Sequence, residues 1–305
     1  AIDPDWLDPE NGATLWVDLA SPTDAEARLL SESFHFHELA VEDALSEIHN
    51  PKVEDYPGFL YLALHGIDFE ASKHAFATHE VDFFLGPNFL VTVHDSTSRS
   101  IERWRTACPK NAHLLAEGAG ALMHRIVDVM VDNYEPEIEK IETRLEELET
   151  EVFQRPRGHV IREILAVKRD ISTLRRVTTP QRDVIGRLAR REFPLISDTV
   201  SYRFRDVYDH LVRYSDEALT MLDRVSGLLD AHLSTVSNRL NEVMKVLTII
   251  SVIFMPLSVL TGLYGMNVPL PHLPGGEQAQ FWWVIFFIGA TAVTMLAFFR
   301  RKGWW

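Results

Sequence analysis

The segment VLTIISVIFMPLSVLTGLYGMN, residues 246–267, contains no Asp, Glu, Lys or Arg side chain. At about 1.5 Å of rise per helical residue, it is long enough to cross a hydrocarbon layer of ~30 Å. A second apolar segment, FWWVIFFIGATAVTMLAFF, occupies residues 281–299. The connection, residues 268–280, is too short to form a folded domain. We therefore expect two transmembrane helices joined as a hairpin by one short loop.

Basic residues flank the two apolar segments on one side only. Lys245 precedes the first segment, the tail of residues 300–305 opens with Arg-Arg-Lys, and the loop between the segments has no Lys or Arg. Loops rich in Lys and Arg stay on the cytoplasmic side of a membrane. This asymmetry predicts that both termini are cytoplasmic and that the loop faces outward.

The charge and cysteine content of the chain exclude some classes of function for the 245 residues that precede the apolar segments. The chain carries 30 basic and 44 acidic residues, a net charge of −14. Nucleic-acid binding depends on neutralising phosphates, so this balance argues against a nucleic-acid partner and suits attraction of cations. Cys108 is the sole cysteine, which excludes an intramolecular disulfide framework.

Residues 1–111 have the pattern of a cytoplasmic α/β domain. Short β-branched or aromatic runs predict strands, and capped or periodic stretches between them predict helices. The expected strands are 14–19, 59–67, 75–84 and 89–94, and the expected helices are 23–34 and 38–48. Gly86-Pro87-Asn88 predicts a hairpin turn between the last two strands, and Thr23 with Glu26 predicts a capping box.

Residues 112–194 change to long helices and predict an acidic helical hairpin. Apolar residues recur at steps of four and three, a heptad stripe. The stripe comprises Val127, Val131, Tyr134, Ile138, Ile141, Leu145, Leu148 and Val152, and resumes at Val160, Ile164, Val167, Ile171 and Leu174. Pro136 permits a kink or a break. Eight glutamates between Glu135 and Glu151 form either an ordinary solvated face, the commoner case, or a surface that concentrates cations.

A third helix is expected to begin near Ser197 or Ser201 and to continue into the first apolar segment. It forms a cytoplasmic stalk over residues 195–245 and the first transmembrane helix over residues 246–267. Gly227 is the one residue before Pro256 that weakens this helix. Continuous to Leu263, the helix would measure on the order of 90 to 100 Å, which requires packing against other helices or other copies of the chain.

One face of this helix carries a stripe of polar, small or flexible side chains. Steps of three and four connect Asp230, Ser234, Ser237, Asn241, Met244, Thr248, Ser251, Met255, Ser258 and Gly262. Ser and Thr in membrane helices often bond their own backbone or help helices pack, so the stripe has a purely structural explanation. The alternative is a pore lining. Two crossings cannot enclose water alone, so a pore requires a homo-oligomer.

Short segments along nearly the whole chain resemble one known family. They are Tyr264-Gly265-Met266-Asn267, Phe254-Met255-Pro256-Leu257, Asn241 to Ile250, Arg205 to His210, Val41 to Leu45 with Pro51 to Glu54, and the tail from Arg300 to Trp305. These look like the CorA family of divalent-cation channels. The resemblance implies a homopentamer in a bacterial or archaeal inner membrane, with a cytoplasmic α/β domain, a long α-helical stalk and two C-terminal transmembrane helices.

The resemblance also implies roles for individual residues. Gly265, Met266 and Asn267 match the selectivity filter, in which neutral carbonyl oxygens of Asn267 hydrogen-bond the water shell of Mg²⁺. Gly265 would permit a left-handed or tight turn there. Met244 and Leu247 match a hydrophobic constriction, and Asp230 matches the acid at the cytoplasmic mouth. Pore-lining roles follow for Asn241, Ser251, Met255 and Ser258. Asp43 and Asp206 match carboxylates that bind a regulatory divalent ion between subunits.

The loop between the apolar segments departs from the usual acidic pattern of the family, and this departure bears on the identity of the ion. Pro274-Gly275-Gly276 resembles the ZntB branch, which is associated with zinc, although that branch usually has Val where this chain has Met266. His272 would suit a soft ion such as Zn²⁺, but a lone loop histidine more often faces solvent. Glu277 is the other loop residue able to carry charge. Mg²⁺ is the expected ion, with Co²⁺, Ni²⁺ or Zn²⁺ as the alternative.

Two functions of other classes are also compatible with parts of the chain. A metal-dependent hydrolase site could draw on His35, His37, His65, His74, His79 and His94, but the sequence has no His-Glu-x-x-His spacing, nucleophile elbow or phosphate loop. A membrane-tethered scaffold would explain the hairpin, although a tether has no need of the polar stripe. An enzyme is therefore not expected, and the predicted partners are the lipid bilayer, divalent cations and other copies of the chain.

Overall fold

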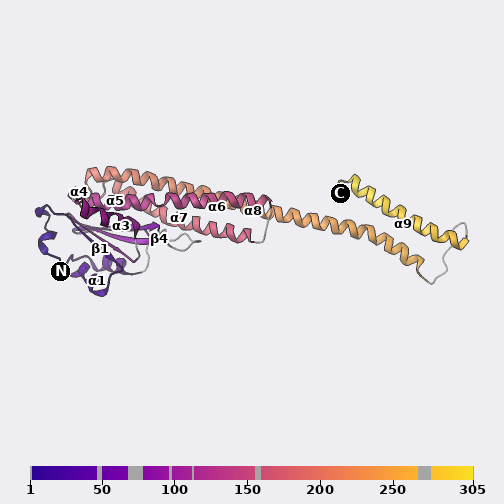
Figure 1. Ribbon diagram of the computed structural model, residues 1–305, viewed down its shortest axis with the longest axis horizontal. Coiled ribbons are helices and arrows are strands. Elements are labelled where there is room, and N and C mark those ends of the chain that lie inside the picture. The colour runs from indigo at the N-terminus through magenta and orange to yellow at the C-terminus, as the bar shows by residue number, and fades with distance from the viewer. Residues whose placement is uncertain are drawn as a thin grey trace. The chain divides into compact units, whose positions relative to one another are not determined.

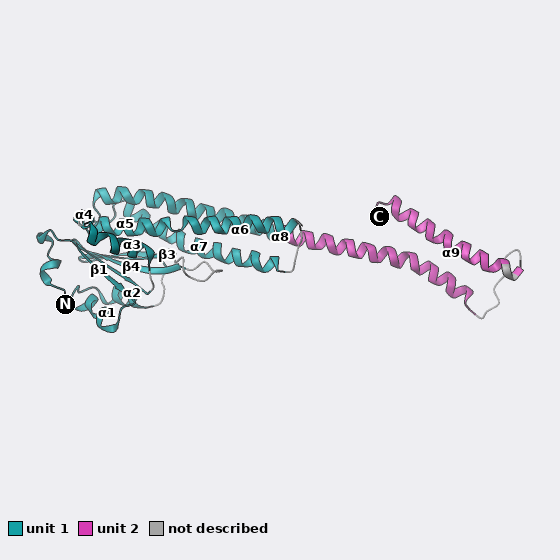
Figure 2. Cartoon of the chain, viewed as in Figure 1, with its two compact units in different colours: residues 1–229 teal, residues 230–305 magenta. Residues whose placement is uncertain are grey.

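The computed structural model describes residues 2–46, 50–67, 78–95, 98–111, 113–154, 159–266 and 276–304. These residues form two compact units, residues 1–229 (unit 1) and residues 230–305 (unit 2) (Figure 2). Several residues with predicted roles lie outside the described residues: Asn267, His74, the turn at 155–158, and the loop from 268 to 275 with His272. The finer boundaries expected at residues 111 and 194 stay predictions.

Unit 1 contains a five-stranded sheet in the order β1-β5-β4-β3-β2 (Figure 1). β2 (Lys52–Tyr56), β3 (Phe59–Ile67), β4 (Thr78–Leu85) and β5 (Phe89–His94) are antiparallel neighbours, and β1 (Leu15–Ala20) pairs with β5 in parallel. The predicted hairpin turn between β4 and β5 is confirmed, since Gly86 N–H donates to the Phe89 carbonyl over 2.9 Å. Glycine suits this position, because a Cβ would lie 2.2 Å from the Phe89 ring and the ring would have to move.

Strand β2 was missed by the sequence prediction. Its five residues, KVEDY, include three charged side chains, and only Val53 is buried. The strand lies at the edge of the sheet, where one ladder of hydrogen bonds and one buried face suffice. Charged residues are common on such strands, which hides them from a search for apolar runs.

Two helices cover one face of the sheet. They are α1 (Asp24–Glu32), with the predicted capping box of Thr23 and Glu26, and α2 (Glu38–Leu45). The core between them and the sheet is largely aromatic and aliphatic; it comprises Leu19, Leu30, Phe36, Ala40, Phe59, Tyr61, Ala63, Phe84, Val91 and Val93. Lys52, Ala63, Asp82 and Val93 are successive cross-strand neighbours, so all four side chains point to this face. The apolar core therefore continues into a polar row at the β2 edge.

Helices α5 (Ala119–Asp132) and α7 (Val160–Ala189) also contact the sheet. α5 contacts β3, β4 and β5, and α7 contacts β2 and β3. Buried polar contacts join α7 and the residue that precedes α6 to β3: the Gln181 side chain accepts from the His65 N–H over 2.8 Å, and the Tyr134 hydroxyl donates to the His65 carbonyl over 2.8 Å. The shorter elements are η1 (Pro4–Leu7), η2 (Pro9–Asn11), α3 (Arg99–Ala107), η3 (Cys108–Lys110) and α4 (His113–Ala116).

The predicted heptad stripe is confirmed as the contact face of the long helices. Every stripe residue from Val127 to Val152, and from Val160 to Leu174, is buried. The helical structure is interrupted at residues 133–134, between α5 and α6 (Glu135–Gln154). Pro136 therefore lies in the first turn of α6, where the N–H that proline lacks would have no helical acceptor. α6, α7 and the first part of α8 lie alongside one another (Figure 1).

Helix α8 (Asp198–Tyr264) runs for 67 residues, with Ser197 accepting from the Val200 N–H ahead of its first turn. Its last part and α9 (Gly276–Arg301) form unit 2, as the apolar runs predicted. By length and composition, α8 and residues 279–301 of α9 are each able to cross a membrane. Lys245 donates to the Gly303 carbonyl over 3.4 Å and lies 5.9 Å from the Trp304 ring, so the basic ends of the two apolar segments are in contact.

Candidate cation-binding and pore residues

Helix α9 covers one face of α8 within unit 2 and leaves the polar stripe open. From residue 236 to its end, the half-buried positions of α8 are Lys245, Ile249, Ile253, Pro256, Leu257, Leu260 and Tyr264. The predicted pore residues lie on the rest of the helix and are exposed; they are Asp230, Asn241, Met244, Leu247, Ser251, Met255 and Ser258. Some hydroxyl groups of the stripe bond their own backbone, as Thr248 does to the Met244 carbonyl over 2.7 Å. The stripe as a whole remains free to face water or another chain.

The first apolar helix ends within the predicted filter motif. α8 stops at Tyr264, and the Gly265 N–H still donates to the Thr261 carbonyl over 2.9 Å. Gly265 does not have a positive φ, so the left-handed turn that was one of the two expectations for this residue is wrong. The absence of a side chain instead allows Gly265 to approach the preceding helical turn closely, because a Cβ would lie 3.0 Å from the Thr261 carbonyl oxygen. Met266 is exposed and Asn267 lies outside the described residues.

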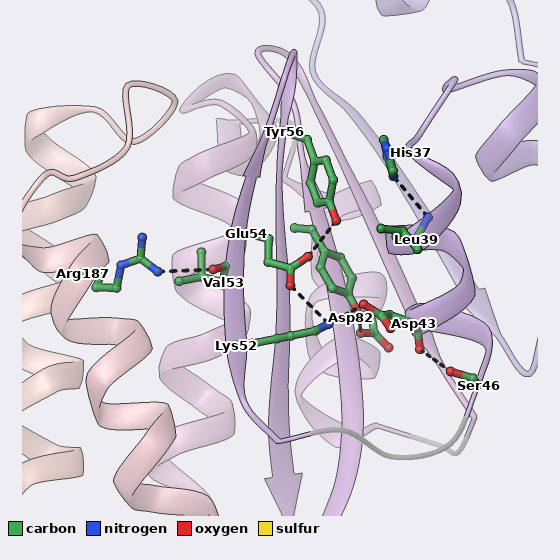
Figure 3. Close-up of polar contacts among 11 residues, drawn as sticks. His37, Leu39, Asp43, Ser46, Lys52, Val53, Glu54, Tyr56, Asp82 and Arg187 are labelled. Carbon is green, nitrogen blue, oxygen red and sulfur yellow. Dashed lines mark hydrogen bonds and ion pairs between the residues drawn. The ribbon is translucent and has the colours of Figure 1, made fainter.

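Asp43 lies in a polar cluster between α2 and the β2 edge (Figure 3). Its carboxylate pairs with the Lys52 ammonium, which also lies 3.5 Å from Glu54 Oε1. The Tyr56 hydroxyl donates to Glu54 Oε2 over 2.7 Å. Partial burial acts to lower the pKa of Lys52, but the hydrogen bond to Asp43 and the charges of both carboxylates outweigh it, so the pKa is raised. Burial and the Glu54 carboxylate raise the pKa of Tyr56 to about 12.

Asp82 forms the buried side of the same cluster. It accepts a hydrogen bond of 2.6 Å from the Tyr61 hydroxyl and is 4% exposed. Burial raises the pKa of this carboxyl group well above its usual range, although the Tyr61 hydrogen bond opposes the shift. A pocket of about 290 Å³ adjoins it; the lining residues are Ser21, Pro22, Ala44, Leu45, Ser46, Glu80, Asp82, Val93, His94 and Asp95.

Asp206 lies in a different cluster, on an exposed turn of α8 in unit 1. Burial, and after it the charge of Asp206, raises the pKa of Asp128 on α5. Burial and the charge of Asp128 raise the pKa of Asp132, whose Oδ1 lies 3.6 Å from His210 Nδ1. Asp128 and Asp132 were not singled out from the sequence, because their heptad neighbours mark that helix as a packing element. None of these contacts joins Asp206 to Asp43.

The histidines considered for a hydrolase do not form a metal site in the described part of the chain. His65 points to one sheet face, paired across strands with Glu80, whereas His94 pairs with Val81 on the opposite face and contacts Asp18 over 3.1 Å. His37 caps α2 by accepting from the Leu39 N–H. Across the described residues, no group of three or more His, Cys, Asp or Glu side chains is placed to hold a metal ion.

Relatives of known sequence cover nearly the whole chain. YfjQ of Bacillus subtilis is 35% identical over 96% of this chain and 90% of its own length. The cobalt/magnesium transport protein CorA of Thermotoga maritima is 34% identical over 97% of this chain and 84% of its own. The zinc transport protein ZntB of Pectobacterium carotovorum is 24% identical over 86% of this chain and 79% of its own.

The architecture also has a solved counterpart. The CorA magnesium transporter from Methanocaldococcus jannaschii superimposes with a TM-score of 0.84 at 25% identity, covering 95% of this chain and 91% of that one. This likeness confirms the predicted fold class of an α/β domain, a long helix and two C-terminal apolar helices. The family model described as CorA-like Mg2+ transporter protein matches residues 11–301. The chain therefore belongs to the CorA-like Mg2+ transporter protein family, and it is a divalent-cation transporter rather than an enzyme.

Proposed function

We propose that this transporter is a homopentameric channel that moves Mg²⁺ through an axial pore lined by α8. The observation that carries the proposal is the exposed polar stripe, which α9 leaves uncovered from Asp230 to Ser258. A lone hairpin would leave Ser251 and Ser258, polar members of the stripe inside the apolar segment, facing lipid, where unsatisfied polar groups are costly. Copies of α8 around one axis would turn the stripe toward water and the apolar faces toward lipid.

The filter in this proposal is formed by Gly265, Met266 and Asn267 at the outer end of the pore. Mg²⁺ gives up its water slowly, so neutral amide and carbonyl oxygens can select it by hydrogen-bonding its hydration shell. A ring of carboxylates would hold the ion more tightly and slow its release. Further in, rings of Met244 and Leu247 would form an apolar constriction that closes by excluding water.

Regulation would occur where Asp43 of one subunit meets Asp206 of the next. Within one chain the two side chains have different neighbours, Lys52 and Glu54 for the first and Asp128 for the second. This separation supports a site completed only between copies. A divalent ion bridging the carboxylates would hold the ring closed, and loss of the ion would let like charges repel and loosen the subunits.

The choice of ion follows from the relatives and from the filter chemistry. The relatives named above transport cobalt and magnesium in one case and zinc in another. The amide filter favours Mg²⁺, and His272 in the loop leaves Zn²⁺, Co²⁺ or Ni²⁺ as the second candidate. By the charge asymmetry around the apolar segments, both termini lie in the cytoplasm of a bacterial or archaeal cell, with the hairpin in the inner membrane.

Ion flux into liposomes tests the channel directly. The full chain, reconstituted with a membrane potential, should admit Mg²⁺, and Asn267→Asp or Asn267→Ala should abolish this uptake. Asn111→Ala, an amide change in unit 1, serves as the matched control and should leave uptake unchanged. Equal uptake by the Asn267 variants would overturn the proposed filter, and absence of any divalent flux would favour a membrane tether. Running Co²⁺ and Zn²⁺ in parallel decides the ion.

A further inference from the structure

Lys52 is the charged side chain that pairs with Asp43, the residue proposed to bind the regulatory ion. It lies on the edge strand β2, next to Ala63 across the ladder, and its side chain is 27% exposed. Its ammonium pairs with the Asp43 carboxylate (Figure 3). It also lies 5.4 Å from the centre of the Tyr61 ring. The negative charge of Asp43 is therefore already matched within the subunit.

A second carboxylate is positioned to receive Lys52 if it leaves Asp43. Glu54 Oε1 is 3.5 Å from the Lys52 ammonium, and Glu54 Oε2 accepts a hydrogen bond from Tyr56. Glu54 follows Lys52 by two residues on the same strand, so both side chains leave the same face. A rotation about side-chain bonds would transfer the ammonium from one carboxylate to the other without moving the backbone.

We propose that Lys52 is a built-in competitor of the regulatory cation. Its ammonium pairs with Asp43 when the divalent ion is absent and moves to Glu54 when the ion binds. Two cations on one carboxylate repel each other, so ion binding must displace the ammonium. A partly exposed ion pair is weak enough to exchange reversibly. Lys52 thereby raises the cation concentration at which the channel closes. The inference rests on the proposed regulatory role of Asp43.

Protection from proteolysis in detergent measures this effect on the full chain without requiring ion flux. The midpoint for protection by Mg²⁺ should fall on the order of tenfold in Lys52→Gln, because the competing charge is gone. Lys52→Arg keeps the charge and should stay within about twofold of the unchanged protein. Lys140→Gln, which removes another lysine paired with a carboxylate, is the matched control and should not shift the midpoint.

Salt separates direct competition from a general field effect. At about 0.5 M KCl the screening length is only a few ångströms, so a long-range effect would vanish, whereas a contact effect would persist. An unchanged midpoint in Lys52→Gln, or a shift that disappears in high salt, overturns the role of Lys52. Asp43→Asn and Asp206→Ala report on the underlying site. If both variants are protected like the unchanged protein, the proposed regulatory site itself is wrong, whatever Lys52 does.

Discussion

Asp82 brings a carboxyl group into the core of unit 1, where Tyr61 is its hydrogen-bond donor. Burial favours the neutral acid, so the folded chain holds the proton at a pH where the unfolded chain has released it. Between the unfolded pKa, about 3.9, and the raised folded pKa, the folded state binds more protons than the unfolded state. In this window the carboxyl group lowers the free energy of unfolding as pH rises.

Asp82→Asn tests this linkage. The amide still accepts a hydrogen bond from Tyr61 but does not titrate. Above pH ~4, the free energy of unfolding should therefore fall less with rising pH in the variant than in the unchanged protein. Thermal unfolding is followed from pH 4 to 8 for both proteins. The difference between their midpoint temperatures should grow as pH rises, and the variant should have the higher midpoint temperature at pH 8. Parallel curves for the two proteins would contradict a raised pKa at Asp82.

Few residue roles were accessible from the sequence without the family resemblance. Asp43 and Asp206 were assigned by likeness to a motif, while Lys52, the side chain that contacts Asp43, received no role. The contact depends on how α2 lies over the β2 edge. The periodicity of a sequence indicates which face of one element is buried, but it does not show which side chains of two elements meet. The alternation of Lys52, Glu54 and Tyr56 was the available signal, because it places the three side chains on one face of a strand.

At the scale of elements, long periodic helices were predictable and a short edge strand was not. The heptad stripe fixed the buried faces of α6 and α7, and the uncharged runs fixed the apolar parts of α8 and α9. Many residues contribute to each of these patterns, so local exceptions such as Pro136 do not obscure them. β2 has five residues and one buried side chain, too few for a pattern to emerge.

Two glycines allow opposite tests of element stability. Gly86→Ala should destabilise unit 1 by about 1–3 kcal/mol, because the added Cβ would displace the Phe89 ring from its contacts with Phe34 and Phe36. Gly227→Ala lies within α8 with no atom within 4 Å of the added Cβ, and it should stabilise the helix by about 0.5–1 kcal/mol. Thermal unfolding of both variants measures the difference, and equal shifts would contradict the turn geometry.

At the scale of the whole molecule, the proposed pore assigns the exposed polar stripe of unit 2 to contacts with other copies of the chain. The face of α8 that includes Ile249 and Ile253 is half-buried within unit 2, and the face that includes Ser251 and Met255 is exposed. A closed ring of copies gives every chain the same environment, whereas an open array would continue to add copies. The polar face is therefore expected to meet its own copies around a single axis.

Cysteine cross-linking distinguishes the two faces of α8. Cys108 is the sole cysteine and can be replaced by serine, so Ser251→Cys and Ile249→Cys can each be introduced into a cysteine-free chain. A disulfide requires Cα atoms within about 7 Å, which copies around a narrow pore reach and copies separated by lipid do not. Oxidation in membranes should therefore produce covalent dimers from Ser251→Cys and far fewer from Ile249→Cys, whose side chain lies on the half-buried face. Equal dimer yields from the two variants, or a higher yield from Ile249→Cys, would exclude an axial pore lined by this face.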